Sequence, residues 1–232
     1  MNWKPPNQLT IARIGLAGAF FVLLGLYGRG YYLGPLLLLA AFVVYIVAGI
    51  TDVLDGWIAR KYNWTSAFGR IADPFVDKVL VVGAFVMLTG SNFAMLAPIS
   101  PYAPGPVASP FIGSCPFEYY LPIWLTGRMA SAVQSWMVVV ILARELIVSA
   151  VRGYSESRGV KFPATPAGKI KMFIQSVAIC TVLYQQAILY HTPWAIVLKV
   201  VIVWLAVAAT VASGLAYVGK TWRILKSDEH AP

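Results

Sequence analysis

Residues Leu36–Ile50 read LLLLAAFVVYIVAGI, and no charged side chain interrupts them. A helix that crosses a membrane needs about 20 mainly apolar residues, and the apolar stretch around this run extends over residues 34–54. A membrane β-barrel would instead show short segments in which apolar and polar residues alternate. The run therefore predicts a transmembrane α-helix.

The rest of the chain has the same apolar character. Hydrophobic residues make up 59% of the sequence and charged residues 12%, at a mean hydropathy of +0.72, which is too apolar for a soluble protein. We predict an all-α integral membrane protein with six transmembrane helices, in one domain of residues 1–232. The other five predicted spans are residues 13–28, 75–98, 129–151, 171–190 and 193–218.

Two segments outside the spans have a distinct composition. Residues 1–12 contain Trp3, Lys4 and two prolines, and we expect them to lie along the membrane interface. Residues 98–122 hold seven of the fifteen prolines and no basic residue, so we expect an irregular external loop. The first apolar run lacks a small-residue cleavage site, which predicts a retained helix rather than a signal peptide.

The basic residues predict the orientation of the chain in the membrane. The sequence has 18 Lys and Arg residues against nine Asp and Glu, a net charge of +9. If both termini are cytoplasmic, 15 of the 18 lie on the cytoplasmic side or at that end of a helix, as the positive-inside rule requires. Membrane topology thus explains the charge, and no nucleic-acid partner is expected.

Four of the nine acidic residues fall within 26 residues that flank one predicted cytoplasmic turn. Asp52 and Asp55 are three residues apart at the end of the second span, and Asp73 and Asp77 are four apart at the start of the third, so each pair shares a helix face. A carboxylate at the centre of a membrane helix costs about 2.5–3.5 kcal/mol, so the cluster needs cations. Carboxylate oxygens favour Mg²⁺ or Mn²⁺ over zinc, and four of them predict a pair of ions suited to phosphoryl displacement.

Glycine and arginine residues complete a motif around these aspartates. Residues 52–60 and 69–77 fit the pattern DxxDGxxAR(x8)GxxxDxxxD without a departure. This motif resembles that of the CDP-alcohol phosphatidyltransferase family. The resemblance implies six transmembrane helices, a cytoplasmic active site and two divalent metal ions. It also implies that the metals are bound by Asp52, Asp55, Asp73 and Asp77, that the general base is Asp77, and that the CDP-lipid donor is bound by Gly56, Arg60, Ser66 and Gly69.

Further segments narrow the resemblance to the phosphatidylglycerophosphate synthase branch of the family. The resemblance to this branch implies that the protein is a homodimer, surrounded by membrane lipids, in the inner (cell) membrane of a bacterium. The loop at residues 98–122 is longer than expected for that branch. The matching segments are residues 7–13 with NxLTxxR, 73–78 with DPxxDK, 143–152 with AREIxxSxLR, and 168–172 with GKxKT, where Met172 replaces the threonine.

Basic residues near the cytoplasmic side also predict the acceptor. Arg144 and Arg152 are eight residues apart and project from similar sides of the fourth predicted span, while Lys169 and Lys171 open the fifth. Such a pocket suits an acceptor that carries a phosphate better than uncharged serine or inositol. Together with the resemblance, this predicts transfer of the phosphatidyl group from CDP-diacylglycerol to glycerol 3-phosphate, giving phosphatidylglycerophosphate and CMP.

Other interpretations stay open at this point. A sibling transferase that uses inositol phosphate would need a similar basic pocket, and a sibling that uses another alcohol is a further alternative. A cation transporter is a remote alternative, because its acids would be distributed through the membrane depth, whereas Glu145 is the only acid in the four other predicted spans. Basic residues can also be simple positive-inside anchors, which we favour for Arg158 and Lys161, and Lys199 is expected to snorkel toward the opposite interface.

Overall fold

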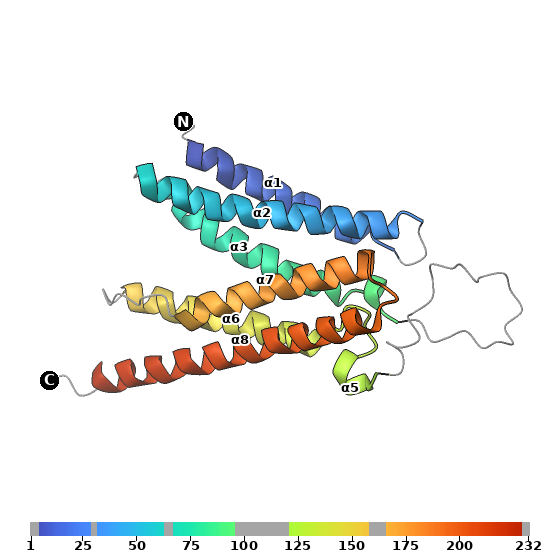
Figure 1. The fold of residues 1–232 in the computed structure, drawn as a ribbon. Coiled ribbons are helices and arrows are strands. Elements are labelled where there is room, and N and C mark those ends of the chain that lie inside the picture. Colours follow the sequence, from blue (N-terminus) through green and yellow to red (C-terminus); the bar gives the residue numbers. More distant parts are fainter. Residues whose placement is uncertain (1–4, 29–31, 63–66, 96–120, 158–165, 229–232) are drawn as a thin grey trace, which may run out of the picture.

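The described part of the chain is almost entirely helical (Figure 1). Its one β interaction is an isolated bridge between Ala94 and Met129. This computed structural model confirms the predicted all-α class. It describes residues 5–28, 32–62, 67–95, 121–157 and 166–228, of which the side chains at 5–9, 55–60, 62, 67–74, 155–156, 166–167 and 218–228 are outside the description.

Six long helices are present among the described residues, one for each predicted span. Two short elements, the 3-10 helix η1 (Ser91–Phe93) and α5 (Ile123–Thr126), lie between the third and fourth of them. The predicted loop at 98–122 falls outside the described residues except for its last two. The bounds of the long helices are α1 Pro5–Leu26, α2 Gly34–Tyr62, α3 Ala67–Leu88, α6 Ser135–Ser157, α7 Pro166–Ala187 and α8 Pro193–Asp228.

Prolines mark where several helices begin. Pro5 opens α1, Pro35 is the second residue of α2, Pro166 opens α7 and Pro193 opens α8. Proline suits the first turn of a helix because the N–H group that it lacks would have no partner there. Residues 5–12 run without a break into the rest of α1, so this part of the predicted interfacial segment is continuous with the first long helix.

Two predicted spans extend beyond the observed helices by six residues or more. The third was predicted to reach residue 98, whereas α3 ends at Leu88 and leads into η1. The fourth was predicted to begin at residue 129, whereas α6 begins at Ser135. Gly127, Arg128 and Ala132 have positive φ angles of 62°, 58° and 58°, a left-handed geometry that cannot continue an α-helix. Hydropathy alone does not detect such turns.

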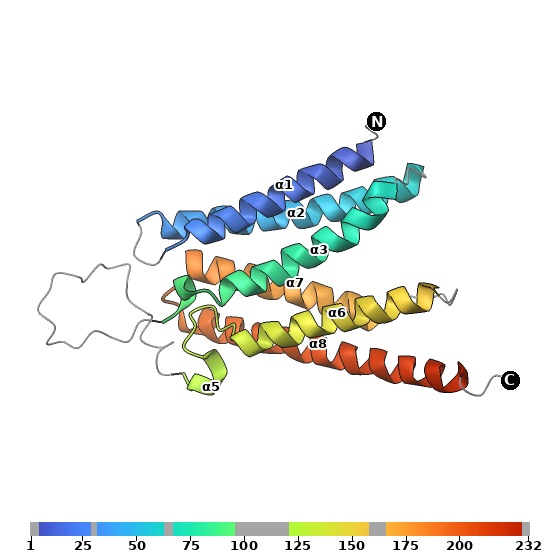
Figure 2. The same ribbon diagram turned by 180° about the vertical axis from the view of Figure 1, so that it is seen from behind.

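The long helices form one bundle in which α7 joins two groups. Helix α1 packs on α2 and α3, α8 packs on α6 and α7, and α7 contacts both α2 and α3. Both termini lie at the same end of the bundle, although they are apart from each other (Figure 1). The view from behind shows the same arrangement, with α5 at the opposite end (Figure 2). Because the number of long helices is even, the chain ends on the side of the bundle where it began. This agrees with the prediction that both termini lie on one side of the membrane.

Apolar side chains occur both inside and outside the bundle. Phe20, Phe85 and Met137 are among the fully buried core residues, yet each of the six long helices also exposes large apolar side chains on its outer face. A soluble protein rarely leaves such surface in water. Within the described residues, Gly34–Leu54 and Pro193–Tyr217 are long and apolar enough to cross a membrane. The fold thus has the apolar exterior that a lipid environment favours.

Lys199 does not lie where the sequence predicted it. Its side chain is 0% exposed, and Nζ donates hydrogen bonds to the Ala130 carbonyl at 2.5 Å and to Gln185 Oε1 at 2.9 Å. The predicted snorkelling is therefore wrong. The segment between α5 and α6 brings the Ala130 carbonyl to α8, and Gln186 on α7 also donates to it at 2.8 Å. Because these oxygens accept its hydrogen bonds inside the protein, the Lys199 ammonium group does not extend to the membrane interface.

Candidate active site

Charged side chains from α1, α2 and α3 meet in the half of the bundle that holds the termini. Nη1 of Arg13 on α1 lies 2.8 Å from Oδ1 of Asp52 on α2 and 3.6 Å from Oδ1 of Asp77 on α3. The Arg13 side chain is only 1% exposed, whereas both carboxylates are partly exposed. Two of the four predicted metal-binding aspartates, hereafter the acidic pair, thus converge from separate helices on one guanidinium.

The rest of the acidic motif lies at positions whose side chains are not described. Asp55 follows Asp52 within α2, and Asp73 precedes Asp77 within α3. An α-helix completes a turn in about 3.6 residues, so each is about one turn from a member of the acidic pair. The predicted donor-binding residues are also outside the described side chains, namely Gly56, Arg60, Ser66 and Gly69.

The acidic pair fits a hard divalent ion. Asp52 and Asp77 offer only carboxylate oxygens, the donors that Mg²⁺ and Mn²⁺ prefer, and the position of Arg13 shows that one cationic group reaches both. No group of three or more possible metal ligands occurs among the described residues. That finding leaves out Asp55 and Asp73, so the predicted two-metal site stays a prediction.

A cavity of about 570 Å³ opens beside the acidic pair. Arg13, Asp52 and Asp77 form its charged part, and its walls are mainly apolar side chains of α2, α3 and α7. Farther along α2, the Tyr45 hydroxyl donates a hydrogen bond to Ser176 Oγ at 3.3 Å. A ligand with a charged head and apolar tails would match this division of the cavity.

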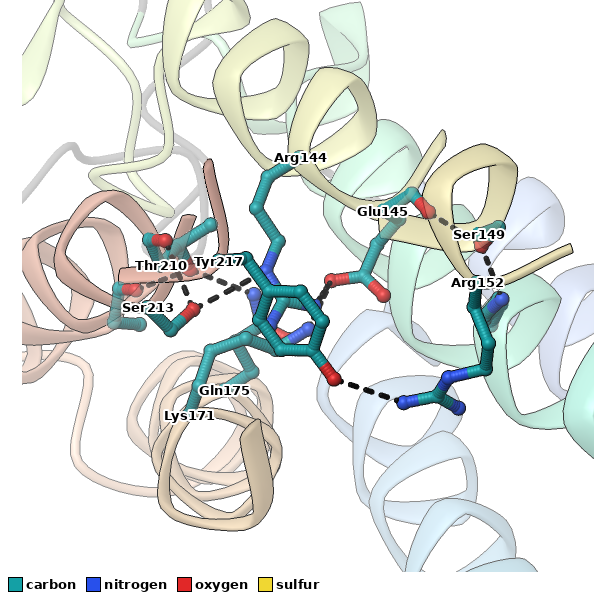
Figure 3. Close-up of polar contacts among 11 residues, drawn as sticks. Arg144, Glu145, Ser149, Arg152, Lys171, Gln175, Thr210, Ser213 and Tyr217 are labelled. Atoms are coloured by element: carbon teal, nitrogen blue, oxygen red, sulfur yellow. Dashed lines mark hydrogen bonds and ion pairs between the residues drawn. The ribbon is translucent and has the colours of Figure 1, made fainter. Parts of the chain in front are cut away.

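A second group of charged residues joins α6 to α7 and α8 (Figure 3). We call it the basic cluster, and it consists of Arg144, Glu145, Arg152 and Lys171. Arg144 Nη1 lies 2.9 Å from Glu145 Oε1, and Lys171 Nζ bonds to the same oxygen. Arg144 Nε also donates to Ser213 Oγ on α8 at 3.1 Å. The cluster sets three cations against one carboxylate and therefore carries a surplus of positive charge.

Ser149 connects the basic cluster to the helix of Asp77. Lys78 Nζ donates a hydrogen bond to Ser149 Oγ at 2.5 Å, and Ser149 Oγ donates to the Glu145 carbonyl at 2.5 Å. Lys78 directly follows Asp77 in the sequence. Two successive hydrogen bonds therefore connect α3, which carries Asp77, to α6, which carries most of the basic cluster.

The other two predicted acceptor residues have different surroundings. Arg152 Nη2 donates to the Tyr217 hydroxyl on α8 at 3.1 Å (Figure 3), and its Nε is buried without a hydrogen-bond partner in the described part of the chain. An unsatisfied buried donor costs about 1–3 kcal/mol, so Arg152 has hydrogen-bonding capacity left for an anion. Lys169 is exposed on α7 and forms no ion pair with a described acid.

Sequence reasoning gave no role at the site to Arg13, Lys78 or Glu145. Each nevertheless has a signal in the sequence: Arg13 ends the NxLTxxR segment, Lys78 ends DPxxDK, and Glu145 is the only acid of the fourth predicted span. Each has at least one partner on another helix, so only the tertiary structure shows the full set of its contacts.

Comparison with known families covers most of the chain. The model of the family CDP-alcohol phosphatidyltransferase matches residues 3–103 and 111–212. The chain belongs to this family. Members are integral membrane enzymes, so membership confirms the predicted transferase class and sets the cation-transporter alternative aside.

Individual relatives show how far the similarity of this CDP-alcohol phosphatidyltransferase extends. The CDP-diacylglycerol–glycerol-3-phosphate 3-phosphatidyltransferase of Bacillus subtilis (strain 168) is 30% identical over 231 residues, which cover 96% of this chain and 97% of the relative. The protein of the same name from Shigella flexneri serotype 5b (strain 8401) is 28% identical and covers 94% of each chain. The probable phosphatidylglycerophosphate synthase of Mycobacterium tuberculosis (strain ATCC 25618 / H37Rv) is 29% identical, over 94% of this chain and 81% of the relative.

Proposed function

We propose that this CDP-alcohol phosphatidyltransferase moves the phosphatidyl group of CDP-diacylglycerol to glycerol 3-phosphate and releases CMP. The observation that carries the proposal is the surplus charge of the basic cluster, where Arg144 and Lys171 share the single carboxylate of Glu145 and Arg152 bonds instead to the neutral Tyr217 hydroxyl. Such a surplus suits an acceptor that brings its own phosphate. The names of the relatives from Bacillus subtilis and Shigella flexneri state this donor and this acceptor.

In the proposed reaction, Asp77 accepts the proton of the acceptor hydroxyl. The hydroxyl oxygen attacks the phosphorus that carries the lipid, a new O–P bond forms, and the bond from that phosphorus to the oxygen of CMP breaks. CMP leaves with the electron pair of that bond. The basic cluster holds the acceptor phosphate, and the hydrogen bonds through Lys78 and Ser149 support the position of the cluster relative to α3.

The four aspartates would hold the metal ions of the family. Two ions, Mg²⁺ or Mn²⁺, would be bound by Asp52, Asp55, Asp73 and Asp77, and when bound they neutralise the pyrophosphate of the donor. Support comes from the acidic pair, whose oxygens converge on one cationic side chain. Asp77 then serves both as a ligand and as the base.

The cavity beside the acidic pair is the proposed donor site. Apolar side chains such as Leu80, Phe173 and Val177 line it and would contact the acyl chains. The cytidine diphosphate would lie near the turn between α2 and α3, close to the residues that the family motif assigns to it: Gly56, Arg60, Ser66 and Gly69. The acceptor phosphate is assigned to Arg144, Arg152, Lys169 and Lys171, with the exposed Lys169 as the weakest member.

We further propose that all six long helices span the membrane, that residues 1–12 lie at its interface, and that residues 1–232 form one domain. Both termini and the active site would be cytoplasmic, in the inner membrane of a bacterium, and the protein would form a homodimer. Exposed apolar side chains on every long helix support the spans. Reporter tags at both termini should read cytoplasmic and a tag near Pro106 external; a cytoplasmic Pro106 would contradict this topology.

The acceptor is tested with the purified protein, CDP-diacylglycerol, Mg²⁺ or Mn²⁺, and a panel of alcohols. Release of CMP is measured with glycerol 3-phosphate, inositol phosphate, inositol and serine. We expect the highest kcat/KM with glycerol 3-phosphate. A higher value with inositol phosphate would assign the sibling activity, which the basic cluster also accommodates. No CMP release with any acceptor would contradict the transferase proposal itself.

A further inference from the structure

Arg13 is an unusual residue for a helix that packs in a membrane bundle. Its side chain is buried, and its Nη1 faces one carboxylate of α2 and one of α3. Arginine stays charged at any physiological pH. A buried charge of this kind is destabilising unless it is paired, and the acidic pair provides the partners. Arg13 and the acidic pair thus compensate each other's charge.

The charges around Arg13 do not balance. Among the described side chains, one guanidinium faces two carboxylates, those of Asp52 and Asp77. Arg13 alone therefore brings one positive charge against the two negative charges of the acidic pair. The site keeps a negative charge that attracts divalent ions, and it also contains a permanent positive charge that repels them.

We propose that Arg13 is a resident counter-ion of the metal site, which holds Asp52 and Asp77 together when no metal is bound and lowers the affinity of the site for divalent ions. The inference rests on the proposed metal site and adds a residue that limits its affinity. With a moderate affinity, the acidic pair can release a bound divalent ion and exchange it for another. Arg13 here is a positioning residue, because it acts through the carboxylates.

This role predicts two opposite effects of one substitution. Arg13→Gln removes the charge and keeps a polar, though shorter, side chain. In EDTA, the variant should have a lower Tm than the wild type, because the acidic pair loses the guanidinium that lies between its two carboxylates. Its Mn²⁺ affinity should rise about tenfold or more, because like charges a few ångströms apart repel strongly even at the effective dielectric of a protein surface.

The measurement needs neither lipid substrate nor turnover. Free Mn²⁺ is titrated by electron paramagnetic resonance against the full chain in detergent, and Tm is recorded in EDTA and in MnCl₂. Arg13→Lys keeps the charge and should keep the Mn²⁺ affinity within about threefold of the wild type. Arg128→Gln is the matched control for loss of one charge, since Arg128 is exposed and lies two residues after α5, which is at the end of the bundle opposite the termini. This control should leave both readouts unchanged.

Each outcome decides between named alternatives. Unchanged or weaker Mn²⁺ binding by Arg13→Gln, with normal binding by the wild type, overturns the counter-ion role alone and leaves the transferase proposal standing. Absence of Mn²⁺ binding by the wild type contradicts the metal site, and with it both proposals. If Arg13→Gln does not fold in EDTA, it is prepared in MnCl₂: recovery there supports the proposal, and failure in both overturns it.

Discussion

Two lysines, one toward each end of the bundle, are both almost completely buried, yet their surroundings differ. Lys171 on α7 is 2% exposed and bonds to the carboxylate of Glu145, beside Arg144. Lys199 on α8 is 0% exposed and donates to two neutral oxygens, of Ala130 and Gln185. The two lysines are buried to nearly the same degree, but Lys171 has charged neighbours whereas Lys199 has neutral ones.

This is the difference that we expect between the proposed acceptor site and a purely structural contact. The hydrogen bonds of Lys199 hold the segment between α5 and α6 to the ends of α7 and α8, a role that needs no ligand. Around Lys171, the cations outnumber the acids among the described residues, and Arg152 keeps an unused donor. A surplus of charge that the protein does not neutralise itself indicates an external anion.

Removal of divalent ions should abolish activity. If the acidic pair belongs to the proposed metal site, excess EDTA should stop CMP release, and it should not unfold the protein because the hydrogen bonds of Lys199 involve no metal ligand. Mg²⁺ or Mn²⁺ should restore it. CMP release is the readout, and circular dichroism checks the fold. Full turnover in excess EDTA would refute the metal-dependent mechanism.

Replacement of the base should give the next largest effect. Asp77→Asn keeps the shape of the side chain but removes its ability to accept a proton, so kcat should fall about 10²-fold or more. Binding of CDP-diacylglycerol should be largely retained, and equilibrium binding of labelled donor measures this separately from turnover. A variant with near wild-type kcat would mean that another group is the base.

Substitutions in the basic cluster should act on the acceptor alone. Arg152→Ala removes hydrogen bonds to a charged group, worth about 1.5–3 kcal/mol, so kcat/KM for glycerol 3-phosphate should fall about 10- to 150-fold. The loss should appear mainly as a higher KM for the acceptor, with the KM for CDP-diacylglycerol little changed. Lys171→Met should act in the same direction.

Three substitutions with the same change of charge serve as controls for the basic cluster. Arg158→Ala and Lys161→Ala should have little effect if these residues are only topological anchors. Lys169→Ala should have a smaller effect than Arg152→Ala, because Lys169 is exposed. If all of these variants weaken catalysis equally, general charge rather than a specific contact is responsible, and the acceptor assignment is wrong.

Lys199→Met should have the smallest effect on activity and a visible effect on stability. The substitution keeps the volume but leaves the oxygens of Ala130 and Gln185 without this donor, and a lost hydrogen bond from a charged group costs about 1.5–3 kcal/mol. Each kcal/mol lowers the Tm of a chain of this size by about 2–4 °C. A thermal melt measures the shift, and kcat/KM should stay near the wild-type value. A large loss of activity with an unchanged Tm would remove the distinction between the two lysines.

The comparison also shows how far the sequence can predict this molecule. Long apolar runs locate all six long helices, because a helix that must be apolar on its outer face has a strong hydropathy signal. The same signal fails at Gly127–Ala132, where left-handed backbone geometry, which hydropathy does not detect, keeps α6 from beginning before Ser135. The motif points to Asp52 and Asp77, which the structure brings together at Arg13.

Pairings between helices were beyond the reach of the sequence. Nothing in the sequence around Lys199 indicates that a carbonyl some 70 positions away in the chain, that of Ala130, will be its partner. Similarly, Arg13 and Glu145 are single charges whose meaning depends on which helix packs beside them. Local patterns specify elements and motifs, whereas contacts between helices follow from packing that a single sequence does not display.

The location of Arg13 on the first long helix has a consequence for the order in which the protein is made. A ribosome delivers α1 to the membrane before α2 and α3, so the guanidinium arrives ahead of Asp52 and Asp77. Each carboxylate can then enter next to a waiting opposite charge, which lowers the cost of an acid in lipid. Biogenesis can thus proceed through the third helix before the nascent chain has captured a single metal ion.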